Sequence, residues 1–440
     1  MSLMSLARRI GFWALDYLRG GEIRADYKEI RRVDSLDSSD PEINRLQSAQ
    51  WEKLRDSACK YTEYYRGMTG KDLSDFPIIN KMTIRTAQDS FLSQKYAREN
   101  LIQMSTSGST GTPFICYQNA GKKKRVNAEA IYYSEKVGYR LGDNLSYIRT
   151  IVKQNSKTGL KQFMQNQTLI NCMSLDDQGI SGMIDAIRRV SNHGKVTLLG
   201  YGSTYTAICD YAKKNQIKVF DGVNVTGVIS GSDMLFDQTR SKIADLFGKI
   251  PVVSRYSNEE NGIIGQDEGI NNVFSINESD YIVAICDDEG NSLPEGDVGR
   301  IIVTDLYNEA MPMIRYDTGD MGAIKTFEIN GRKKRCICSF SGRSVDLIRD
   351  TKGSILSPHA ITNHMWSFPE IVQYQLIQKD PQSYEIRLNV PDDFRREDEL
   401  MEVLYRLLGK DASIRIERVD EIPVLASGKR RYIVNEMNNH

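Results

Sequence analysis

The sequence predicts an α/β protein in which a large N-terminal domain of mixed sheets and helices precedes a small α+β domain. Strand-like and helical runs alternate from about residue 101 to residue 341, which is typical of an α/β architecture with at least part of its sheet parallel. After about residue 345 the pattern changes to shorter alternating runs around one amphipathic helix. The chain has 440 residues, 40% of them hydrophobic, and this length allows two or three domains with a large core.

The N-terminal stretch MSLMSLARRIGFWALDYLRGG (1–21) predicts a single helix that is apolar on most sides. Two arginines precede an apolar segment, as in a signal peptide, but Asp16 and Arg19 interrupt that segment and no small-residue cleavage site follows. No apolar stretch of the chain approaches the roughly 20 residues that span a bilayer. We therefore expect a helix docked on the protein body, with peripheral contact to a membrane surface as the alternative.

The overall charge and the cysteines narrow the class of protein. Lys+Arg and Asp+Glu balance at 58 each, so the whole-chain charge does not indicate a nucleic-acid partner. The seven cysteines are scattered and odd in number, which favours a reducing compartment over a disulfide framework. We expect a cytoplasmic protein, and the sequence leaves its oligomeric state open.

Individual elements of the large domain follow from local patterns. Residues 41–95 are helical in character, and TGVISGSD (226–233) indicates a strand followed by a turn. FDQTRSKIADLFG (236–248) then predicts a helix that ends at glycine, and PVVSRY (251–256) predicts the next strand. Residues 287–306 form a turn-rich hairpin that leads into a buried strand.

The small domain combines two alternating strands with one helix. YEIRLNV (384–390) and SIRIERV (413–419) alternate apolar and polar residues. Between them, EDELMEVLYRLLGK (397–410) places five apolar residues on one helical face. We predict a large N-terminal domain over residues 1–344 and a small C-terminal domain over residues 345–440.

The run STSGSTGTPF (105–114) is too small and too hydroxyl-rich to contribute to a core. Glycines let a chain approach a ligand closely, and serine and threonine hydroxyls with free N–H groups suit phosphate oxygens. LIQMS (101–105) before the run is expected to end a buried strand, and FICYQ (114–118) after it has apolar residues at alternate positions. The pattern predicts a phosphate-binding loop between two strands, with a flexible linker as the alternative.

This loop differs from a Walker P-loop, because no Gly-Lys pair in the chain is followed by serine or threonine. A nucleotide would be held by hydroxyls and backbone amides, with a lysine supplied from elsewhere. The run KKKR (122–125) offers cations that could meet a phosphate of CoA, but we expect a solvated turn there.

Four further stretches carry polar or charged residues next to predicted strands or turns. Taken singly, Glu259 and Asp320 are explained as solvated or capping carboxylates, and Lys429 as part of an exposed basic cluster. The stretches are RYSNEENG (255–262), RYDTGD (315–320), SGR (341–343) and IPVLASGKRR (422–431).

In this order, the loop and the four stretches resemble the adenylate-forming enzymes, the superfamily of acyl-CoA synthetases, luciferases and nonribosomal adenylation domains. The closer likeness is to the phenylacetate–CoA ligase branch with its CapK-like members from capsular-polysaccharide clusters, and it covers roughly residues 50–435. The resemblance implies an enzyme that uses ATP and Mg²⁺ to convert a small carboxylic acid into an acyl-adenylate and pyrophosphate. The acyl group then passes to an acceptor, of which CoA is the first candidate.

The resemblance also implies a role for each matching residue. Lys429 would bridge the substrate carboxylate and the α-phosphate, Glu259 would hold Mg²⁺, and Asp320 would accept the ribose hydroxyls with Arg343 nearby. Tyr256 would stack on the base, Ser257 would lie beside it, and Asn258 would replace the usual α-phosphate threonine or serine. The phosphate loop would comprise Ser105, Thr106, Ser107, Gly108, Ser109, Thr110, Gly111 and Thr112. The adenine-side turn would comprise Ser230, Gly231, Ser232 and Asp233, and the acid pocket would lie around Tyr201, Gly202 and Ser203.

Two departures from the family pattern bear on the second half of the reaction and on metals. Val345 occupies the position where the family commonly has aspartate, at the pivot of the C-terminal domain, so a CoA-dependent second step is less secure. Cys336 and Cys338 form a C-x-C pair that belongs to a zinc site in some relatives, but residues 262–280 lack the other ligands, and we expect no zinc there.

Two alternatives to an acyl-CoA synthetase stay open. One is a ligase that forms an amide or ester with a sugar amine or hydroxyl during surface polysaccharide biosynthesis. The other is an inactive nucleotide-binding homologue, against which the presence of Glu259, Asp320 and Lys429 argues.

Overall fold

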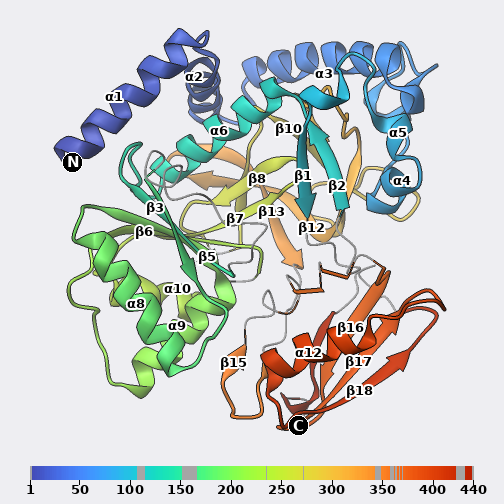
Figure 1. Ribbon diagram of the computed structural model, residues 1–440. Coiled ribbons are helices and arrows are strands. Elements are labelled where there is room, and N and C mark those ends of the chain that lie inside the picture. Colours follow the sequence, from blue (N-terminus) through green and yellow to red (C-terminus); the bar gives the residue numbers. More distant parts are fainter. Residues whose placement is uncertain are drawn as a thin grey trace.

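The computed structural model describes residues 2–106, 114–150, 166–233, 235–270, 272–341, 348–356, 370–422 and 432–438, together with 361, 364, 365, 367 and 368 (Figure 1). The helices are α1 (Leu3–Leu18), α2 (Glu22–Asp34), α3 (Pro41–Tyr61), η1 (Glu63–Tyr65), η2 (Leu73–Asp75), α4 (Lys81–Thr86), α5 (Gln88–Phe91), η3 (Arg98–Asn100), α6 (Ala120–Glu135), α8 (Asp177–Ser191), α9 (Gly202–Lys214), α10 (Asp237–Leu246), α12 (Glu397–Leu408) and η5 (Glu436–Asn438). The strands are β1 (Ile102–Thr106), β2 (Phe114–Gln118), β3 (Asn144–Arg149), β4 (Gln167–Asn171), β5 (Val196–Tyr201), β6 (Val225–Gly231), β7 (Val252–Asn258), β8 (Gly262–Asp267), β9 (Phe274–Ile276), β10 (Tyr281–Cys286), β11 (Gly299–Asp305), β12 (Tyr316–Ile329), β13 (Arg332–Ser341), β14 (Ile348–Arg349), β15 (Ile355–Leu356), β16 (Gln373–Gln378), β17 (Ser383–Asn389), β18 (Ser413–Arg418) and β19 (Ile433–Asn435).

A sheet of 11 strands in the order β10-β11-β12-β13-β9-β8-β7-β6-β5-β3-β4 organises the large domain. Its β4-β3-β5-β6-β7 portion is parallel, which confirms the predicted α/β class. Helices α8, α9 and α10 cover one face of this portion. Ile184 of α8 and Ile208 of α9 belong to the same apolar core as Leu198 of β5 and Val228 of β6. On the opposite face, Val137 packs against β6 and β7.

The remaining strands of the large sheet are antiparallel. The chain turns back from β7 into β8. In the sheet order β8-β9-β13-β12-β11-β10, all neighbouring strands pair antiparallel. Strand β11 is buried along nearly its whole length and follows a turn-rich connection from β10, as the sequence predicts. Helix α3 is tied to this half because the Gln47 side chain donates to the carbonyls of Glu278 (2.9 Å) and Tyr281 (3.2 Å).

Strands β1 and β2 form a separate antiparallel ribbon, with Thr106 paired to Phe114 at its end. The two strands predicted on either side of the run are therefore confirmed, and residues 107–113 between them lie outside the described part of the chain. The expectation that 101–105 end a buried strand is wrong. Phe114 and Cys116 of β2 face the core, whereas Ser105 on β1 is exposed, because a two-stranded ribbon lies at the edge and covers the domain with one face only.

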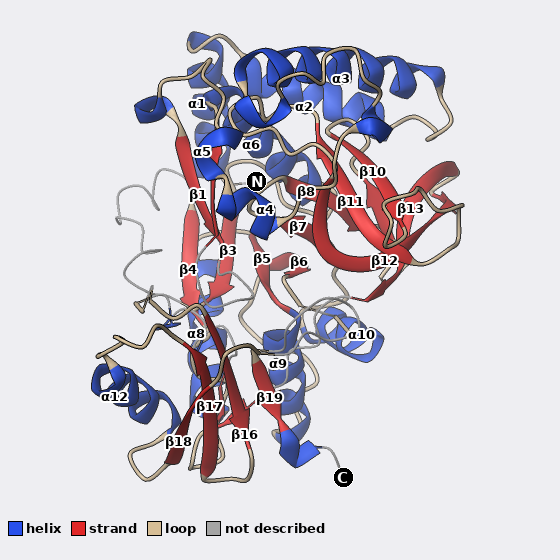
Figure 2. Ribbon diagram, turned by 90° about the vertical axis from the view of Figure 1, so that its right-hand side faces the viewer, coloured by secondary structure: helices blue, strands red, loops and turns tan. Residues whose placement is uncertain are grey.

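The C-terminal region has its own sheet in the order β18-β17-β16-β19, which lies below the large sheet in Figure 2. Helix α12 closes its core with Leu400, Leu404, Leu407 and Leu408, as the helical pattern predicts. The two sheets meet where Met173, after β4, packs against this core and Ser174 pairs with Leu356 of β15. The predicted boundary at 344/345 falls among residues 342–347, which the structure does not describe, and it stays a prediction.

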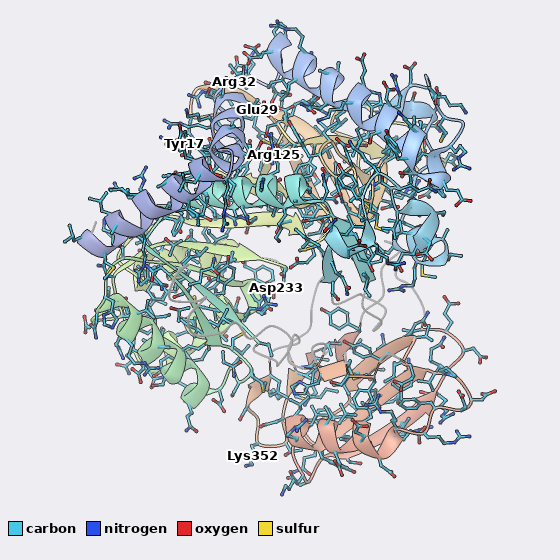
Figure 3. All side chains as sticks on the ribbon, turned by 45° about the horizontal axis from the view of Figure 1, so that its top comes forward. Tyr17, Glu29, Arg32, Arg125, Asp233 and Lys352 are labelled. Carbon is cyan, nitrogen blue, oxygen red and sulfur yellow. The ribbon has the colours of Figure 1, made fainter. Side chains whose placement is uncertain are left out.

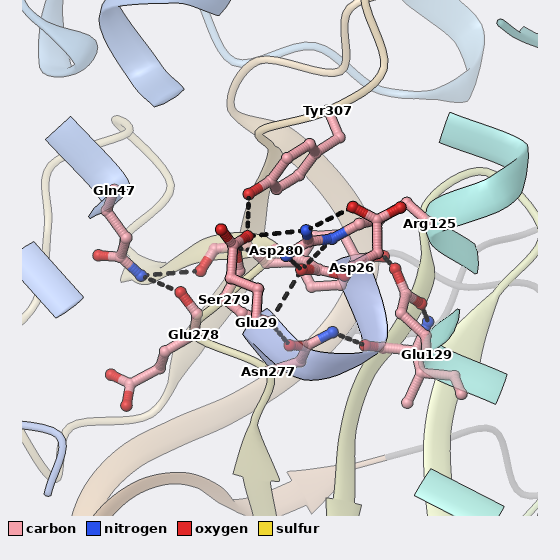
Figure 4. Close-up of polar contacts among 12 residues, drawn as sticks. Asp26, Glu29, Gln47, Arg125, Glu129, Asn277, Glu278, Ser279, Asp280 and Tyr307 are labelled. Carbon is pink, nitrogen blue, oxygen red and sulfur yellow. Dashed lines mark hydrogen bonds and ion pairs between the residues drawn. The ribbon is translucent and has the colours of Figure 1, made fainter. Parts of the chain in front are cut away.

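The expectation of a solvated turn at 122–125 is wrong, because these residues lie within α6. Residues i and i+3 share a helical face, so Lys122 and Arg125 both point into the protein. Lys122 Nζ is 2.8 Å from Asp305 Oδ2, and Arg125 binds Asp280 and, at 2.8 Å, Glu29 (Figure 4). Both cations are buried.

Helix α1 docks on the large domain by one side, as expected, with Phe12 and Trp13 packed near Leu141 and Leu145. None of the helices in the described ranges is long and apolar enough to cross a membrane.

Candidate active site

The carboxyl ends of β5 and β6 bring the predicted acid pocket next to the predicted adenine-side turn. Tyr201 pairs in register with Gly231, and α9 begins directly after it at Gly202. The Asp233 carboxylate accepts hydrogen bonds from the backbone N–H groups of Gly202 and Ser203, the latter at 3.1 Å. Asp233 is labelled in Figure 3. These N–H groups form the N-terminus of α9, where a helix leaves its amides unpaired and favours negative charge.

The local backbone and the electrostatics both set the position of Asp233. Ser232 has a φ of +71°, a left-handed conformation that L-residues rarely adopt outside turns and functional sites. Burial raises the pKa of Asp233 to about 6, even though the hydrogen bonds from Ser203 and Gly202 act to lower it. This carboxyl group therefore titrates close to neutrality and has backbone amides, rather than a cation, as its neighbours.

Two consecutive glutamates in the turn from β7 to β8 differ in burial. The Glu260 carboxylate is buried, where it pairs with Lys81 Nζ at 2.6 Å and accepts from Tyr316 Oη at 3.0 Å. Burial alone would raise the pKa of Glu260, but Lys81 holds it below the usual value. Glu259, by contrast, is exposed. The turn is fixed because Asn258 Oδ1 accepts from the Asn261 amide at 2.8 Å.

The charges of two cations act on Glu259, namely Arg149, which the sequence did not single out, and Lys123, which belongs to the run expected to be a solvated turn. Desolvation by the surrounding protein raises the pKa of the Glu259 carboxyl, and the charges of Arg149 and Lys123 act in the opposite direction. Because the side chain is exposed, we treat the carboxylate as ionised at neutral pH. Arg149 is the last residue of β3, and Lys123 lies on α6. The Nζ atom of Lys123 is 3.9 Å from Met104 Sδ on β1. The site thus draws on elements from four parts of the chain.

Within the described ranges, neither cation is part of an ion pair. Lys122, Lys124 and Arg125 of the same run do form ion pairs there, whereas Lys123 Nζ lies near Met104 Sδ. The buried Arg149 Nε has no hydrogen-bond partner in that part of the chain. Only weak sequence signals pointed to them. Arg149 is the last residue of a strand whose carboxyl end meets the edge of a parallel sheet, where ligands bind in open α/β folds. Lys123 follows a buried lysine on a helix and so points to another side.

The predicted base and ribose residues are joined directly. Tyr256 Oη donates to Asp320 Oδ2 at 2.9 Å, linking β7 to β12. The Tyr256 ring is 7% exposed and packs edge-on against Phe340, with ring centroids 4.9 Å apart. Asp320 is half-buried, and its own amide donates to Thr318 Oγ1 at 3.2 Å. Ser257, between Tyr256 and Asn258, is exposed.

Several predicted residues lie outside the described part of the chain, namely Lys429, Arg343 and Ser107 to Thr112, and of Thr106 only the backbone is described. The nearest described neighbour of Lys429 on its C-terminal side is Tyr432, which is buried. Tyr432 lies close enough to Tyr201 to influence its ionisation. Tyr432 belongs to the core of the C-terminal domain, against which Met173, after β4, also packs.

The donor set around Glu259 is compatible with magnesium. Among the residues that the structure describes, no three His, Cys, Asp or Glu side chains gather as a protein metal cage. Mg²⁺ commonly uses one or two carboxylates and completes its shell with water and substrate phosphates. One exposed carboxylate next to two cations fits a metal that arrives with a nucleotide. Cys336 and Cys338 lie on β13, both buried in an apolar cluster.

Comparison with known proteins identifies relatives of the chain and proteins that share its fold. Residues 347–436 match the family described as the CapK C-terminal domain. Protein CapK of Staphylococcus aureus is 24% identical over 438 residues, which cover 93% of this chain and 92% of CapK. The phenylacetate–coenzyme A ligase of Thermus thermophilus is 32% identical over 133 residues, 27% of this chain and 29% of the ligase.

The crystal structure of 2-hydroxyisobutyryl-CoA ligase with 2-HIB-AMP and CoA superimposes with a TM-score of 0.59. The superposition covers 92% of both chains at 14% sequence identity. At this identity the likeness shows that the two proteins share their fold.

Proposed function

Since the chain is a homologue of CapK and has the fold of adenylate-forming CoA ligases, we propose that it is an AMP-forming carboxylate ligase. It activates a small carboxylic acid with ATP, forming an acyl-adenylate and releasing pyrophosphate. The acyl group then passes to an acceptor, most simply the thiol of CoA. The identity of the acid is set by the pocket around Tyr201, Gly202 and Ser203.

The observation that supports this proposal is the arrangement of charge at the carboxyl edge of the parallel strands. A carboxylate that attacks an α-phosphate must approach another anion, so cations are needed where negative charge develops. The charges of Lys123 and Arg149 act on Glu259, and neither cation forms an ion pair in the described part of the chain. Glu259 would hold Mg²⁺, whose charge offsets that of the phosphates when it is bound.

The other proposed roles belong to residues that we place around the carboxyl edge of the parallel strands. Asp320, oriented by Tyr256, accepts hydrogen bonds from the ribose hydroxyls, with Arg343 close by. The turn from Ser230 to Asp233 lines the adenine, and Ser105 to Thr112 close on the β- and γ-phosphates. Lys429 serves as the lysine that bridges the acid and the α-phosphate. Its proposed approach is supported by the proximity of Tyr432 to Tyr201, because three residues of extended chain span at most about 11 Å.

A second candidate differs only in the acceptor. CapK matches nearly the whole chain, whereas the phenylacetate–CoA ligases match little more than a quarter of it. The resemblance to CapK-like members from capsular-polysaccharide clusters makes a sugar amine or hydroxyl the second candidate acceptor, with which the same adenylate would form an amide or ester during surface polysaccharide biosynthesis. For either acceptor we place the reaction in the cytoplasm, since all seven cysteines are free thiols.

The test is ATP–pyrophosphate exchange, screened over aromatic, aliphatic and amino acids, with Lys429→Ala as the diagnostic variant. Loss of one preorganised donor typically lowers the rate on the order of 10²–10³-fold. We expect exchange to fall by at least that factor, and consumption of supplied acyl-adenylate to change little, because the lysine acts only in the first step. Lys429→Arg should not restore exchange, since a planar guanidinium does not replace a compact ammonium.

The matched control is Lys410→Ala, which removes an exposed lysine from the same domain. Wild-type protein that supports no exchange with any acid class contradicts the proposal. Equal losses in both half-reactions would assign Lys429 a structural role. Parallel assays of the adenylate with CoA and with amino sugars then decide between the two acceptors.

A further inference from the structure

One face of α1 is exposed and uncharged along the whole helix. Its ten residues follow helical spacing, and every one of them is accessible to solvent. The exposed fraction reaches 86% at Leu3, 60% at Ile10 and 79% at Leu18. The face comprises Leu3, Met4, Leu6, Ala7, Ile10, Gly11, Ala14, Leu15, Tyr17 and Leu18.

The opposite face holds α1 firmly on the large domain. The buried Asp16 carboxylate accepts from the amides of Ile23 (3.2 Å) and Arg24 (3.0 Å), which fixes the corner between α1 and α2. A Cβ at Gly142 would lie 2.1 Å from the Ser5 carbonyl oxygen, so the helix backbone approaches this turn as closely as glycine allows. The apolar face is therefore presented outward by a docked helix at the edge of the molecule (Figure 1).

The accessible charges of α1 are all positive. Arg8 and Arg9 are half-buried, and Arg19, directly after the helix, is exposed, while the one acid of the helix, Asp16, is buried. Beside the helix, a groove of about 480 Å³ is lined by Arg9, Arg140 and Lys195. The acid in this groove, Glu135, already accepts a hydrogen bond from Tyr27 Oη at 2.6 Å. The surroundings of the apolar face thus carry excess positive charge.

The dimensions of the face argue against a second copy of the chain as its occupant. A helix of 16 residues is about 24 Å long and about 10 Å wide, so one face offers on the order of 250 Å². A stable dimer buries about 800 Å² on each partner. An apolar face bordered by cations matches instead the two layers of an anionic lipid surface, hydrocarbon below charged headgroups.

We propose that α1 is an interfacial membrane helix that seats its uncharged face in an anionic lipid surface, with the basic groove against the headgroups. Tyr17, labelled on α1 in Figure 3, lies at the headgroup level, where aromatic rings with a polar tip are favoured. The contact attaches the enzyme to the membrane without spanning it.

Co-sedimentation of the full chain with vesicles tests this inference. Wild-type protein should bind vesicles of phosphatidylcholine with 30% phosphatidylglycerol, and it should bind pure phosphatidylcholine at least tenfold more weakly. Ile10→Glu combined with Leu18→Glu should lower binding to anionic vesicles at least tenfold. Arg140→Ser combined with Lys195→Ser should abolish the preference for anionic lipid while leaving the apolar face intact.

The matched control is Val219→Glu with Val298→Glu, two exposed apolar residues away from α1, which should bind like wild type. Circular dichroism and thermal unfolding check that each variant is folded. Failure of folded wild-type protein to bind anionic vesicles overturns the proposal, as does equal binding by the α1 variant. A wild-type dimer that the α1 substitutions dissociate, without an effect on vesicles, would assign the face to a second copy instead. Pyrophosphate exchange in solution is independent of all these outcomes.

Discussion

In two pairs of consecutive charged residues, one member is buried in an ion pair and the other lies at the candidate site. Lys122 and Lys123 are consecutive in α6, and Glu259 and Glu260 are consecutive in the turn after β7. Lys122 and Glu260 are fully buried and paired with opposite charges, whereas Lys123 and Glu259 face the candidate site. The residue type therefore does not decide whether a charged side chain stabilises the fold or is available to a ligand. What decides is whether it has an oppositely charged partner in the protein interior.

In the buried region, charges from distant parts of the chain satisfy one another. Burial works against the Lys122 charge, but Asp305 and Glu129 hold the lysine pKa above its usual value. Burial also raises the pKa of Glu129 well above the usual range, although the charge of Lys122 acts to lower it. Tyr281 connects the group, since its hydroxyl lies 3.1 Å from Lys122 Nζ and 3.0 Å from Glu129 Oε1. These contacts fasten α6 to the antiparallel half of the sheet.

Lys122→Met should therefore produce the largest loss of stability. Removing one member of a buried ion pair typically costs about 3–5 kcal/mol, because the remaining charge stays buried without its partner. Urea unfolding measures the change. Lys124→Met is the control, since Lys124 pairs with Glu22 at the surface and such pairs contribute about 1 kcal/mol or less. Equal losses in the two variants would mean that the buried network does not carry the stability assigned to it.

The sequence predicts the elements better than it predicts this division. Strands such as β6 and β7 and helices such as α10 and α12 follow from local hydrophobic period and from turn residues, and the structure confirms them. The burial of Lys122 could not be predicted, because a run of four cations indicates a polar surface and Asp305 lies far away in the chain. Long-range pairing overrides the local pattern there.

The candidate site shows the same limit. Glu259 and Asp320 were identified through a resemblance in ordered motifs rather than through any local property. Arg149 and Lys123 belong to no motif, and only the convergence of β3, α6 and β7 reveals them. Their role depends on geometry, which a single sequence does not display.

Asp233 offers an intermediate case, a largely buried carboxyl group that binds backbone amides. Its pKa of about 6 in the folded state exceeds its ordinary value of 3.8, so between about pH 4 and 6 the folded state binds a proton that the unfolded state lacks. Stability falls as the pH rises through this window and is constant above it. At 1.36 kcal/mol per unit, the fall amounts to roughly 3 kcal/mol at most.

Asp233→Asn removes this titration and should flatten the pH dependence of the free energy of unfolding between pH 4 and 7. The comparison must be made with wild type, since Asp26 also has a pKa raised to about 6 by burial and contributes a slope of the same sign. Parallel pH curves for the two proteins would show that Asp233 is ionised throughout and belongs with the surface acids.

The smallest expected effect comes from Lys123, and it sharpens the opening comparison most directly. The charge of Lys123 acts on Glu259, and Lys123 forms no ion pair in the described part of the chain, so its charge is available to an anion in the site. Lys123→Met keeps the apolar stem and removes the charge. The KM for ATP should then rise about tenfold, which corresponds to roughly 1.4 kcal/mol, while the melting temperature stays within a degree or two of wild type. Lys122→Met should show the opposite pattern, with a lowered melting temperature and an unchanged KM at a temperature where it is folded. If both substitutions lower the melting temperature alike and leave the KM for ATP unchanged, both lysines stabilise the fold. Lys123 would then have no role in binding ATP.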